Sequence, residues 1–295
     1  MAKHSSQISR EDHTVTSSDG ESSLFIREWK RGTPQIHFML THGALEHLGR
    51  YDDMIDYLLR SFNNVAVTGF DHLGHGKSGG ARAYIPHFKT YVDDMHLVGA
   101  FMQERNLPET QTFILAHSLG GLITLTRLLD PAFGWSFPLK GVIFSSPCIR
   151  PKSVLGASSE TVLKKLDRVT PKLHLPMIYR GSDLTTDAER ANDFDTDSLI
   201  PKFVTVRMAK EIFDASQRVR GLSYYLKTPS LFLIAGDDLI VDKESTTLFA
   251  HGIDKRLTTI VQYPHSRHEL WNEADRFEVF DTMKKWVDRQ MKETP

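Results

Sequence analysis

Short apolar runs alternate along the chain with longer stretches in which apolar residues recur every three or four positions. The runs are rich in Val, Ile, Leu and Phe and have strand length, which is typical of strands buried on both faces of a sheet. They cover Ser23–Trp29, Ile36–Thr41, Val65–Phe70, Thr112–Ala116, Val142–Ser145, Leu231–Ala235 and Thr259–Tyr263. Residues 1–10 are polar, and we expect them to be frayed.

Helical spacing fills the intervals between these runs. One face of a helix is outlined by Phe88, Val92, Met95, Val98 and Met102. Residues 119–129 are apolar nearly all round, which predicts a buried helix, and residues 277–287 predict an amphipathic C-terminal helix. Strands that alternate with helices predict the α/β class, with a mostly parallel central sheet and helices on both faces. Ligands bind such sheets beyond the carboxyl ends of the strands.

The alternation stops between about Cys148 and Lys227. This segment is rich in proline and has only short helical patterns, at residues 163–169 and 206–219. It is too long for a plain connection between two strands. We therefore predict an inserted cap, residues 148–227, over a core made of residues 11–147 and 228–295. Residues 148–182 hold seven Lys or Arg and two Asp or Glu, whereas residues 183–200 hold one and six.

Overall charge and cysteine content exclude several classes of protein. The 36 Lys and Arg nearly balance the 37 Asp and Glu, so no basic field attracts nucleic acid, and we expect no nucleic-acid partner. No apolar run is long enough to span a bilayer. Cys148 is the single cysteine, which excludes an intrachain disulfide, and the N-terminal residues lack the apolar run of a secretory signal. We expect a cytoplasmic protein, and peripheral contact with a membrane stays open.

The most informative local pattern surrounds Ser118. An apolar strand pattern ends at Ala116, and an apolar helix pattern follows Ser118 at once, beginning with Gly120 and Gly121. This strand, tight turn and helix have the layout of a nucleophile elbow, in which small neighbours let the serine sit on a strained turn. Ala116 stands where the usual first glycine would be. The pattern predicts that Ser118 is a nucleophile.

A serine nucleophile needs a base and a carboxylate that orients the base, and in this class of fold they follow in the order Ser, Asp or Glu, His. The loops after the last two predicted strands offer Asp237, Asp238, Asp242, His265 and His268. We favour Asp238, because the apolar residues 239–241 can bury its side chain, and Asp237 is the alternative. We favour His268 over His265 because it lies deeper in its loop.

Two backbone N–H groups are needed to hold the oxyanion of the reaction. We assign one to Leu119, directly after the nucleophile, and the other to Ala44, because Gly43 lets that loop approach closely. His42 is expected to support the loop. The fourteen histidines lack cysteine partners and a His-x-x-x-His helix, so we expect no catalytic metal and no cofactor.

Five motifs together resemble the α/β-hydrolases, and more narrowly the monoacylglycerol lipases and bacterial lysophospholipases. Residues 42–51, HGALEHLGRY, resemble the H-G-x-x-E-H-x-x-R-Y signature, and residues 71–80, DHLGHGKSGG, resemble the D-x-x-G-H-G-x-S-x-G loop. The elbow at residues 116–121, the acid motif at 236–242 and the histidine motif at 267–269 also match. In the cap, residues 171–176, 184–187 and 197–199 resemble lid segments, with Ser198 in place of the usual proline.

The resemblance implies the α/β-hydrolase fold, with a cap over an acyl-binding pocket. It implies a serine hydrolase that cleaves carboxylic esters of monoacyl lipids through the triad Ser118, Asp238 and His268. We expect the apolar cap residues to line the acyl pocket, chiefly Ile178, Tyr179, Phe203, Met208 and Ile212, with Leu155, Phe194, Ile200 and Phe213.

Other functions stay open on the same sequence. A short-chain carboxylesterase or a serine aminopeptidase has the same elbow, because fold does not determine substrate. A catalytically inactive binding protein normally lacks a triad member, whereas all three candidates are present here. Ser118 disfavours dehalogenases and epoxide hydrolases, which use an Asp nucleophile. Basic residues such as Lys164 and Lys165 beside Leu163 and Leu166 suit an anionic lipid surface, and an ordinary solvated face of the cap is the alternative.

Overall fold

The computed structural model describes residues 7–130, 139–152 and 159–293. Within these residues, eight strands form one sheet in the order β1-β2-β4-β3-β5-β6-β9-β10. The pairs β1–β2 and β2–β4 are antiparallel, and the other pairs are parallel. The strands are β1 (Ile8–Thr16), β2 (Ser23–Arg31), β3 (Ile36–Thr41), β4 (Val65–Phe70), β5 (Gln111–His117), β6 (Leu139–Ser145), β9 (Ser230–Ala235) and β10 (Thr258–Tyr263). The predicted mostly parallel sheet is confirmed.

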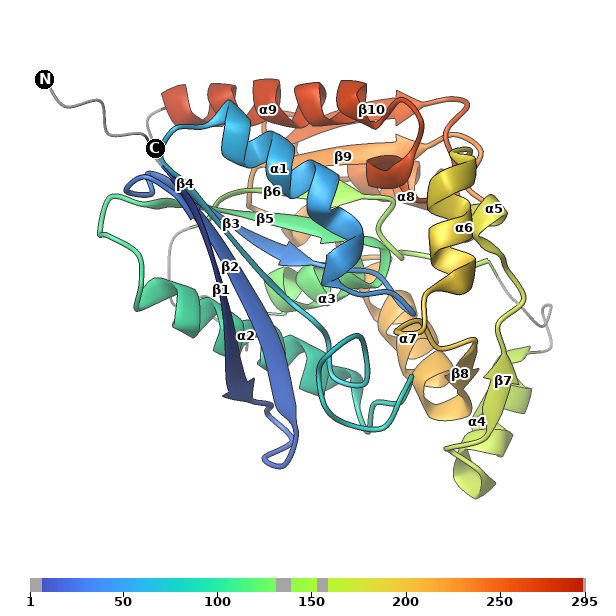
Figure 1. Cartoon of the computed structure of the whole chain (residues 1–295). Coiled ribbons are helices and arrows are strands. Elements are labelled where there is room, and N and C mark those ends of the chain that lie inside the picture. The colour runs from blue at the N-terminus through green and yellow to red at the C-terminus, as the bar shows by residue number, and fades with distance from the viewer. Residues whose placement is uncertain (1–6, 131–138, 153–158, 294–295) are drawn as a thin grey trace, which may run out of the picture.

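Helices cover both faces of this sheet (Figure 1). Phe38 and Leu40 of β3 pack with α1 (Asp52–Ser61) and α9 (Arg276–Lys292) on one face. Between them Met39 points to the other face, which is covered by α2 (Phe88–Gln103), α3 (Ser118–Leu129) and α8 (Lys243–His251). Because successive side chains of a strand point to opposite faces, an unbroken apolar strand serves two cores at once.

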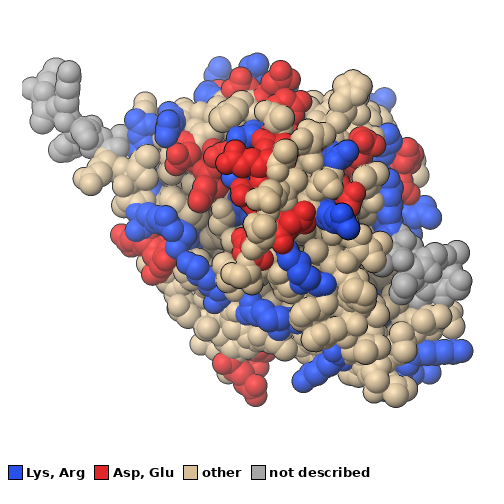
Figure 2. Space-filling view, turned by 45° about the vertical axis from the view of Figure 1, so that its right-hand side comes forward, with Lys and Arg blue, Asp and Glu red and all other residues tan. Residues whose placement is uncertain are grey.

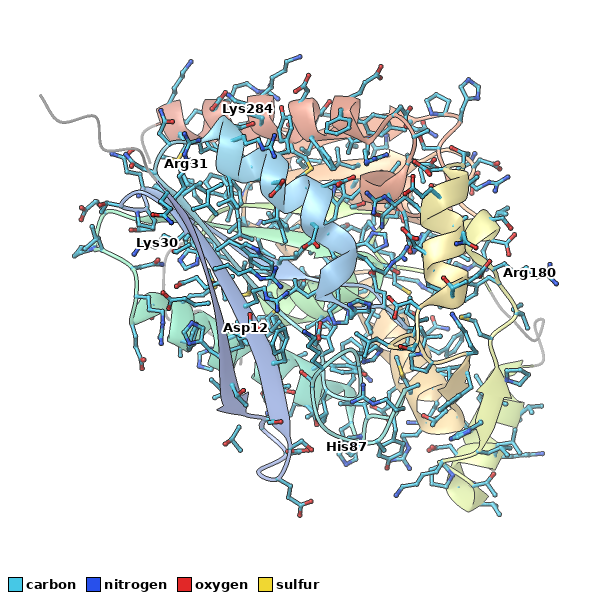
Figure 3. The ribbon with its side chains drawn as sticks, viewed as in Figure 1. Asp12, Lys30, Arg31, His87, Arg180 and Lys284 are labelled. Atoms are coloured by element: carbon cyan, nitrogen blue, oxygen red, sulfur yellow. The ribbon has the colours of Figure 1, made fainter. Side chains whose placement is uncertain are left out.

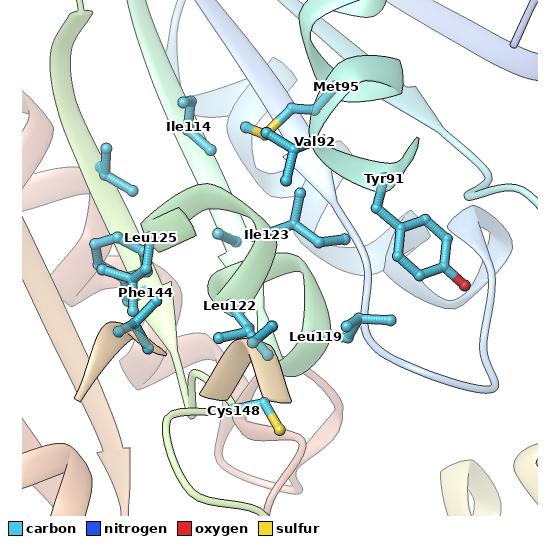
Figure 4. Close-up of a cluster of buried hydrophobic side chains, with 14 of the residues drawn as sticks. Tyr91, Val92, Met95, Ile114, Leu119, Leu122, Ile123, Leu125, Phe144 and Cys148 are labelled. Carbon is cyan, nitrogen blue, oxygen red and sulfur yellow. The ribbon is translucent and has the colours of Figure 1, made fainter. Parts of the chain in front are cut away.

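The core beneath Ser118 is dense and apolar (Figure 4). Side chains of α2 and α3 meet there against β5 and β6, and all are buried: Tyr91, Val92, Met95, Ile114, Leu119, Leu122, Ile123, Leu125 and Phe144. Full burial of one such side chain contributes roughly 1.5–3 kcal/mol to folding. The helix that begins at Ser118 is therefore held firmly from its first turn.

The prediction that residues 1–10 are frayed is wrong for Ile8–Arg10, which are the first residues of β1. This edge strand pairs with β2 over its whole length, but its side chains are mostly exposed, so it has no apolar pattern to predict it. Backbone hydrogen bonds form this strand without a buried face. The helices α1, with 10 residues, and α8, with 9, also lie outside the elements that we predicted from apolar spacing.

Besides the 3-10 helix at Ser223–Tyr225, six elements lie between β6 and β9 in the described part of the chain, and we call residues 148–227 the cap segment. They are α4 (Ser159–Val169), β7 (His174–Pro176), α5 (Gly181–Leu184), α6 (Ala188–Thr196), β8 (Phe203–Thr205) and α7 (Val206–Val219). Figure 1 shows them at the end of the sheet toward which the parallel strands point. The predicted helix at residues 206–219 has the observed bounds, whereas α4 begins at Ser159, before the predicted residue 163.

Polar contacts attach α6 and its flanks to the core. Arg190 pairs with Asp53 of α1 at 2.6 Å, and Asp187 pairs with Arg276 of α9 at 3.2 Å. Glu269 donates its backbone N–H to the carbonyl of Leu184 at 2.8 Å. This side of the cap segment is therefore held against the carboxyl ends of the strands.

Candidate active site

Ser118 lies at the junction of β5 and α3, on a strained turn. Its φ is 47°, a left-handed value that is uncommon for residues other than glycine. A side chain on Gly120 would collide with the carbonyl groups of Thr41 and His42, and one on Gly121 would collide with Pro147. The two glycines thus let α3 pack directly against the ends of β3 and β6, and this packing holds the turn in its strained form.

The structure brings His268 and Asp238 to this serine. The Nε2 atom of His268 lies 2.9 Å from the Oγ of Ser118, and its Nδ1 lies 2.8 Å from the Oδ2 of Asp238. Asp238 follows β9 and His268 follows β10, so neighbouring strands bring the loops together. All three side chains are buried. A hydroxyl bonded to an imidazole that a carboxylate orients is the arrangement of an activated nucleophile and its base.

The alternative acids and base lie elsewhere. Asp237 and His265 are exposed to solvent. Asp242 caps the N-terminus of α8, where its carboxylate accepts hydrogen bonds from the backbone N–H groups of Glu244 and Ser245. The second oxygen of the Asp238 carboxylate accepts two backbone N–H groups at 2.8 Å each, from residues 240 and 241. These bonds hold the carboxylate in the orientation in which it meets the imidazole.

Burial and neighbouring negative charge have opposite effects on the pKa of His268. Burial by itself lowers the pKa of this imidazole, because it disfavours the charged form. The carboxylate of Asp238 raises the pKa through its charge and its hydrogen bond, and Glu269 and Glu46 add to the effect. The net result is a pKa above the ordinary value of 6.5. The site therefore favours the protonated form of this imidazole.

Leu119 and Ala44, whose backbone N–H groups are the predicted oxyanion donors, line the same cavity as Ser118. Leu119 is in the first turn of α3, whose N–H groups have no partner within the helix and carry the positive end of its dipole. Ala44 lies in the loop after β3, and both residues line the cavity. His42 supports this loop: its Nδ1 lies 2.7 Å from the carbonyl of Gly43, and its Nε2 accepts the N–H of His72. Burial holds the pKa of His42 well below its ordinary value.

A buried charge network behind the loop is not predicted by our sequence analysis. The carboxylate of Glu46 accepts the N–H of Gly43 and, at 2.6 Å, the hydroxyl of Tyr51. Arg50 lies between Glu46 and Glu269, with its Nε 3.6 Å from Glu46 and a hydrogen bond to Glu269. Burial, and after it the charge of Glu269, raises the pKa of Glu46 to about 7. The signal in the sequence is the spacing of Glu46, Arg50 and Tyr51 in the first motif.

An apolar cavity of about 350 Å³ opens from Ser118 into the cap segment. Of the five cap residues predicted to line it, Ile178, Tyr179 and Ile212 do so. Its apolar lining also includes Leu163, Leu175, Met177, Leu184, Phe194, Val204, Phe213, Leu239 and Ile240.

The prediction that Phe203 and Met208 line the cavity is wrong. The ring of Phe203 stacks on His174, with 3.7 Å between ring centroids, and Met208 is fully buried in the core beneath α7. Ile200 is also absent from the lining, since it packs with Leu184 and Phe194. Leu155 lies outside the described residues.

Side chains that could hold a metal ion together lie away from this cavity. Within residues 7–130, 139–152 and 159–293, the group of three suitable ligands is Glu11, His13 and Glu28, on β1 and β2. None of them lines the cavity. The chemistry described above uses the serine, the imidazole and the backbone N–H groups.

Comparison with known proteins identifies relatives over most of the chain. Residues 32–275 match the family model described as "Serine aminopeptidase, S33". The chain is 30% identical to monoglyceride lipase of Rattus norvegicus over 94% of this chain and 90% of that protein. It is 28% identical to phospholipase YtpA of Bacillus subtilis over 88% of this chain and 98% of that protein.

Two solved structures share the fold at lower sequence identity. One is a soluble variant of monoglyceride lipase from Saccharomyces cerevisiae, with a TM-score of 0.83 and 18% identity over 98% of both chains. The other is monoacylglycerol lipase of Paleococcus ferrophilus, with a TM-score of 0.77 and 24% identity over 89% of this chain and 98% of that one.

Proposed function

Because the chain belongs to the serine aminopeptidase S33 family of α/β-hydrolases, we propose that it is a serine hydrolase that cleaves the carboxylic ester of monoacyl lipids. The observation that carries this proposal is the 2.9 Å contact of Ser118 with His268 at the end of an apolar cavity. The cavity has the size and apolar lining of a small-molecule site. The relatives named monoglyceride lipase and phospholipase support monoacyl lipids as the substrate class.

The reaction transfers the acyl group to water in two halves. His268 takes the hydroxyl proton of Ser118 as the oxygen attacks the ester carbonyl, and Asp238 stabilises the imidazolium. The N–H groups of Leu119 and Ala44 hold the oxyanion, each contributing about 3 kcal/mol by analogy with other oxyanion donors. The alcohol leaves with the proton from His268. Water, deprotonated by His268, then attacks the acyl-serine and releases the fatty acid.

A fluorophosphonate probe tests the chemistry before any substrate is chosen. The probe reacts with an activated serine, so the wild-type protein becomes labelled and the Ser118→Ala variant does not. Absence of labelling on the folded wild-type protein would contradict the proposal and favour a binding protein with a hydrolase fold.

A substrate panel tests the substrate class. Monoacylglycerols, lysophospholipids, short p-nitrophenyl esters and aminoacyl amides are compared by kcat/KM. We expect the monoacyl lipids to be the best substrates, because the cavity wall is mainly apolar. Preference for a short ester would indicate a carboxylesterase, and preference for an aminoacyl amide would indicate an aminopeptidase.

The cap segment, residues 148–227, is proposed to act as a lid that encloses the acyl chain. It supplies most of the apolar side chains that line the cavity, among them Ile178, Tyr179, Phe194, Ile212 and Phe213. The hydrolase core, residues 11–147 and 228–295, supplies the proposed triad. The division places the chemistry on the sheet and the recognition of the acyl chain on the cap.

The outer side of the cap segment suits contact with an anionic lipid surface. Val169 is 80% exposed and Ile178 is 63% exposed, beside the exposed side chains of Lys165, Arg168 and Arg180. Figure 3 shows Arg180 projecting outward from this side of the molecule, and Figure 2 shows basic side chains at the lower right and acidic ones gathered above. No helix within the described residues is long and apolar enough to cross a membrane. The contact that we propose is peripheral, made by these exposed side chains.

Vesicle binding tests the membrane contact. Binding should rise with the fraction of anionic lipid and fall with salt, since each basic residue near such a surface contributes about 1 kcal/mol. Replacing Lys164 and Lys165 by Gln should weaken binding without changing the turnover of a soluble ester. The control replaces Lys255 and Lys285 by Gln, which makes the same change of charge. Lys255 is exposed in the loop between α8 and β10, and Lys285 is exposed on α9. Equal binding to neutral and anionic vesicles would contradict the contact.

A further inference from the structure

The first residues of the cap segment pair with the loop that contains the proposed catalytic acid. We call residues 150–152 the entry segment and residues 236–242 the acid loop. The backbone N–H of Lys152 donates to the carbonyl of Ile240 at 2.8 Å, and that of Asp242 donates to the carbonyl of Arg150 at 2.9 Å. Pro151 faces Val241 in the antiparallel bridge between them. The entry segment thus forms a short ladder with the acid loop.

The same part of the acid loop holds the carboxylate of Asp238. The N–H groups of Ile240 and Val241 donate to its Oδ1, and Oδ2 meets His268. A shift of residues 240 and 241 would therefore move the carboxylate relative to the imidazole. The ladder with the entry segment resists that shift, because Ile240 makes two hydrogen bonds. Its N–H donates to the carboxylate of Asp238, and its carbonyl accepts the N–H of Lys152.

Two ammonium groups hold the main chain of the acid loop itself. Lys152 donates its Nζ to the backbone carbonyl of Asp238, and Lys243 at the start of α8 donates its Nζ to the carbonyl of Gly236. Hydrogen bonds from a charged donor are stronger than neutral ones. Lys152 also lines the cavity, so one side chain touches both the acyl site and the acid loop.

We propose that Lys152 is a positioning residue for the triad, acting through the main chain of Asp238. This inference rests on the proposed function. The ammonium group restrains the peptide unit that carries the acid, and the entry segment restrains the N–H groups that orient its carboxylate. A neutral side chain at position 152 leaves the acid loop free to shift, so the imidazole loses its alignment with Ser118.

The test compares Lys152→Met and Lys152→Arg with wild type on a soluble short ester. We expect kcat of Lys152→Met to fall by about 10-fold to 100-fold with little change in KM, since a displacement of about 1 Å of a catalytic group can cost about 100-fold. Lys152→Arg keeps the charged donor and should restore most of kcat. Lys285→Met removes the same charge from an exposed site on α9 and is the matched control.

A spectroscopic readout separates positioning from mere packing. The proton between His268 Nδ1 and Asp238 gives a low-field proton resonance in NMR, which we expect to shift or broaden in Lys152→Met and to persist in Lys152→Arg. Lys152 is exposed, so these variants should fold, and their unfolding temperatures check this. Lys152→Gln is a second neutral variant with the same expected readouts, should Lys152→Met unfold early.

Two results would overturn the inference. One is a neutral variant with wild-type kcat and an unchanged resonance. The other is a change in KM alone, which would mean that Lys152 acts only through the cavity wall that it lines and not through the acid loop. Failure of the proposed function is distinguishable, because it would appear as wild-type protein that hydrolyses no ester. The resonance needs no substrate and would still report whether Lys152 holds the acid.

Discussion

Single residues in this protein adopt unfavourable states that the surrounding packing enforces. Ser118 has a positive φ, Glu46 is buried close to another carboxylate, and His42 is buried and neutral. Each such state costs free energy by itself, and the tight contacts around α3 and the loop after β3 maintain it. Strained and charged residues that gather around one cavity indicate a functional site.

The candidate triad makes a prediction that distinguishes neighbouring residues. Ser118→Ala, Asp238→Asn and His268→Ala should each lower kcat for an ester by at least about 10⁴-fold, because triad members act as a unit. Asp237→Asn and His265→Ala change exposed side chains and should leave kcat close to wild type. Steady-state kinetics of the five purified variants, with unfolding temperatures as a check on folding, gives the answer. Loss of activity in His265→Ala instead would reassign the base.

The pH dependence of activity follows from the raised pKa of His268. The free enzyme needs the neutral imidazole as a base, so kcat/KM should fall as the pH drops through the pKa of this group. Because Asp238 raises that pKa above 6.5, the acid limb should lie above 6.5. Asp238→Asn removes the charge, and the limb of its residual activity should move to lower pH. An acid limb below 6.5 in the wild-type enzyme would contradict the assignment.

At the scale of whole elements, the sheet positions the candidate triad and the cap segment forms most of the cavity wall. The parallel strands β5, β9 and β10 end at one edge and bring their loops together there, whereas the helices and short strands of the cap segment, with the residues after β7, supply most of the apolar wall. The orientation of α7 decides which of its side chains reach the cavity. Ala209, Ile212 and Phe213 line the cavity, whereas Met208 packs into the core. One amphipathic helix therefore joins the cap segment to the core and lines the cavity.

Cavity shape should set the preferred acyl chain length. Ile212→Trp places a larger side chain in the cavity, so kcat/KM for long-chain esters should fall relative to a short ester by about tenfold or more, the effect of a few methylene groups in an apolar pocket. Phe203→Trp, on β8 outside the lining, is the control and should leave the profile unchanged. Kinetics across a series of p-nitrophenyl esters measures both variants. An unchanged profile in Ile212→Trp would argue against an acyl site here.

At the scale of the whole molecule, buried histidines couple stability to pH. Burial lowers the pKa of His37 to about 4, of His72 to about 3 and of His75 to about 4. The unfolded chain takes up protons on these rings below about pH 6.5, whereas the folded protein does not. The free energy of unfolding therefore contains a part that is present above pH 6.5 and is lost progressively as the pH falls.

The variant His37→Gln isolates one of these contributions. His37 lies on β3 away from the cavity, where its ring meets Asn106 and Thr68. Between pH 6.5 and about 4 the wild-type protein should lose up to about 3 kcal/mol more of its free energy of unfolding than the variant. Urea unfolding at a series of pH values measures this difference. Parallel pH profiles for the two proteins would show that His37 takes up its proton in the folded state.

The local pattern of the sequence by itself determined the parallel core and the position of Ser118, the proposed nucleophile, between a strand and a helix. Apolar runs of strand length, helical spacing and small residues around Ser118 act over a few neighbouring residues, and the printed chain contains them directly. The order of the loops also limited the acid and the base to a few candidates, because parallel strands end at the same edge. The break in the alternation of strands and helices predicted the inserted cap, and the family motifs added its acyl-binding role and the substrate class.

Tertiary structure alone decided what depends on contacts between distant segments. The sequence favoured Asp238 and His268 over their neighbours, but the burial of both side chains and the exposure of Asp237 and His265 follow from the packing of the two loops. The strand β1 forms because it pairs with β2 at the edge of the sheet, and the orientation of α7 points Met208 into the core and away from the cavity. Such outcomes arise from burial and hydrogen bonds across many residues of chain, which the spacing of residue types does not encode.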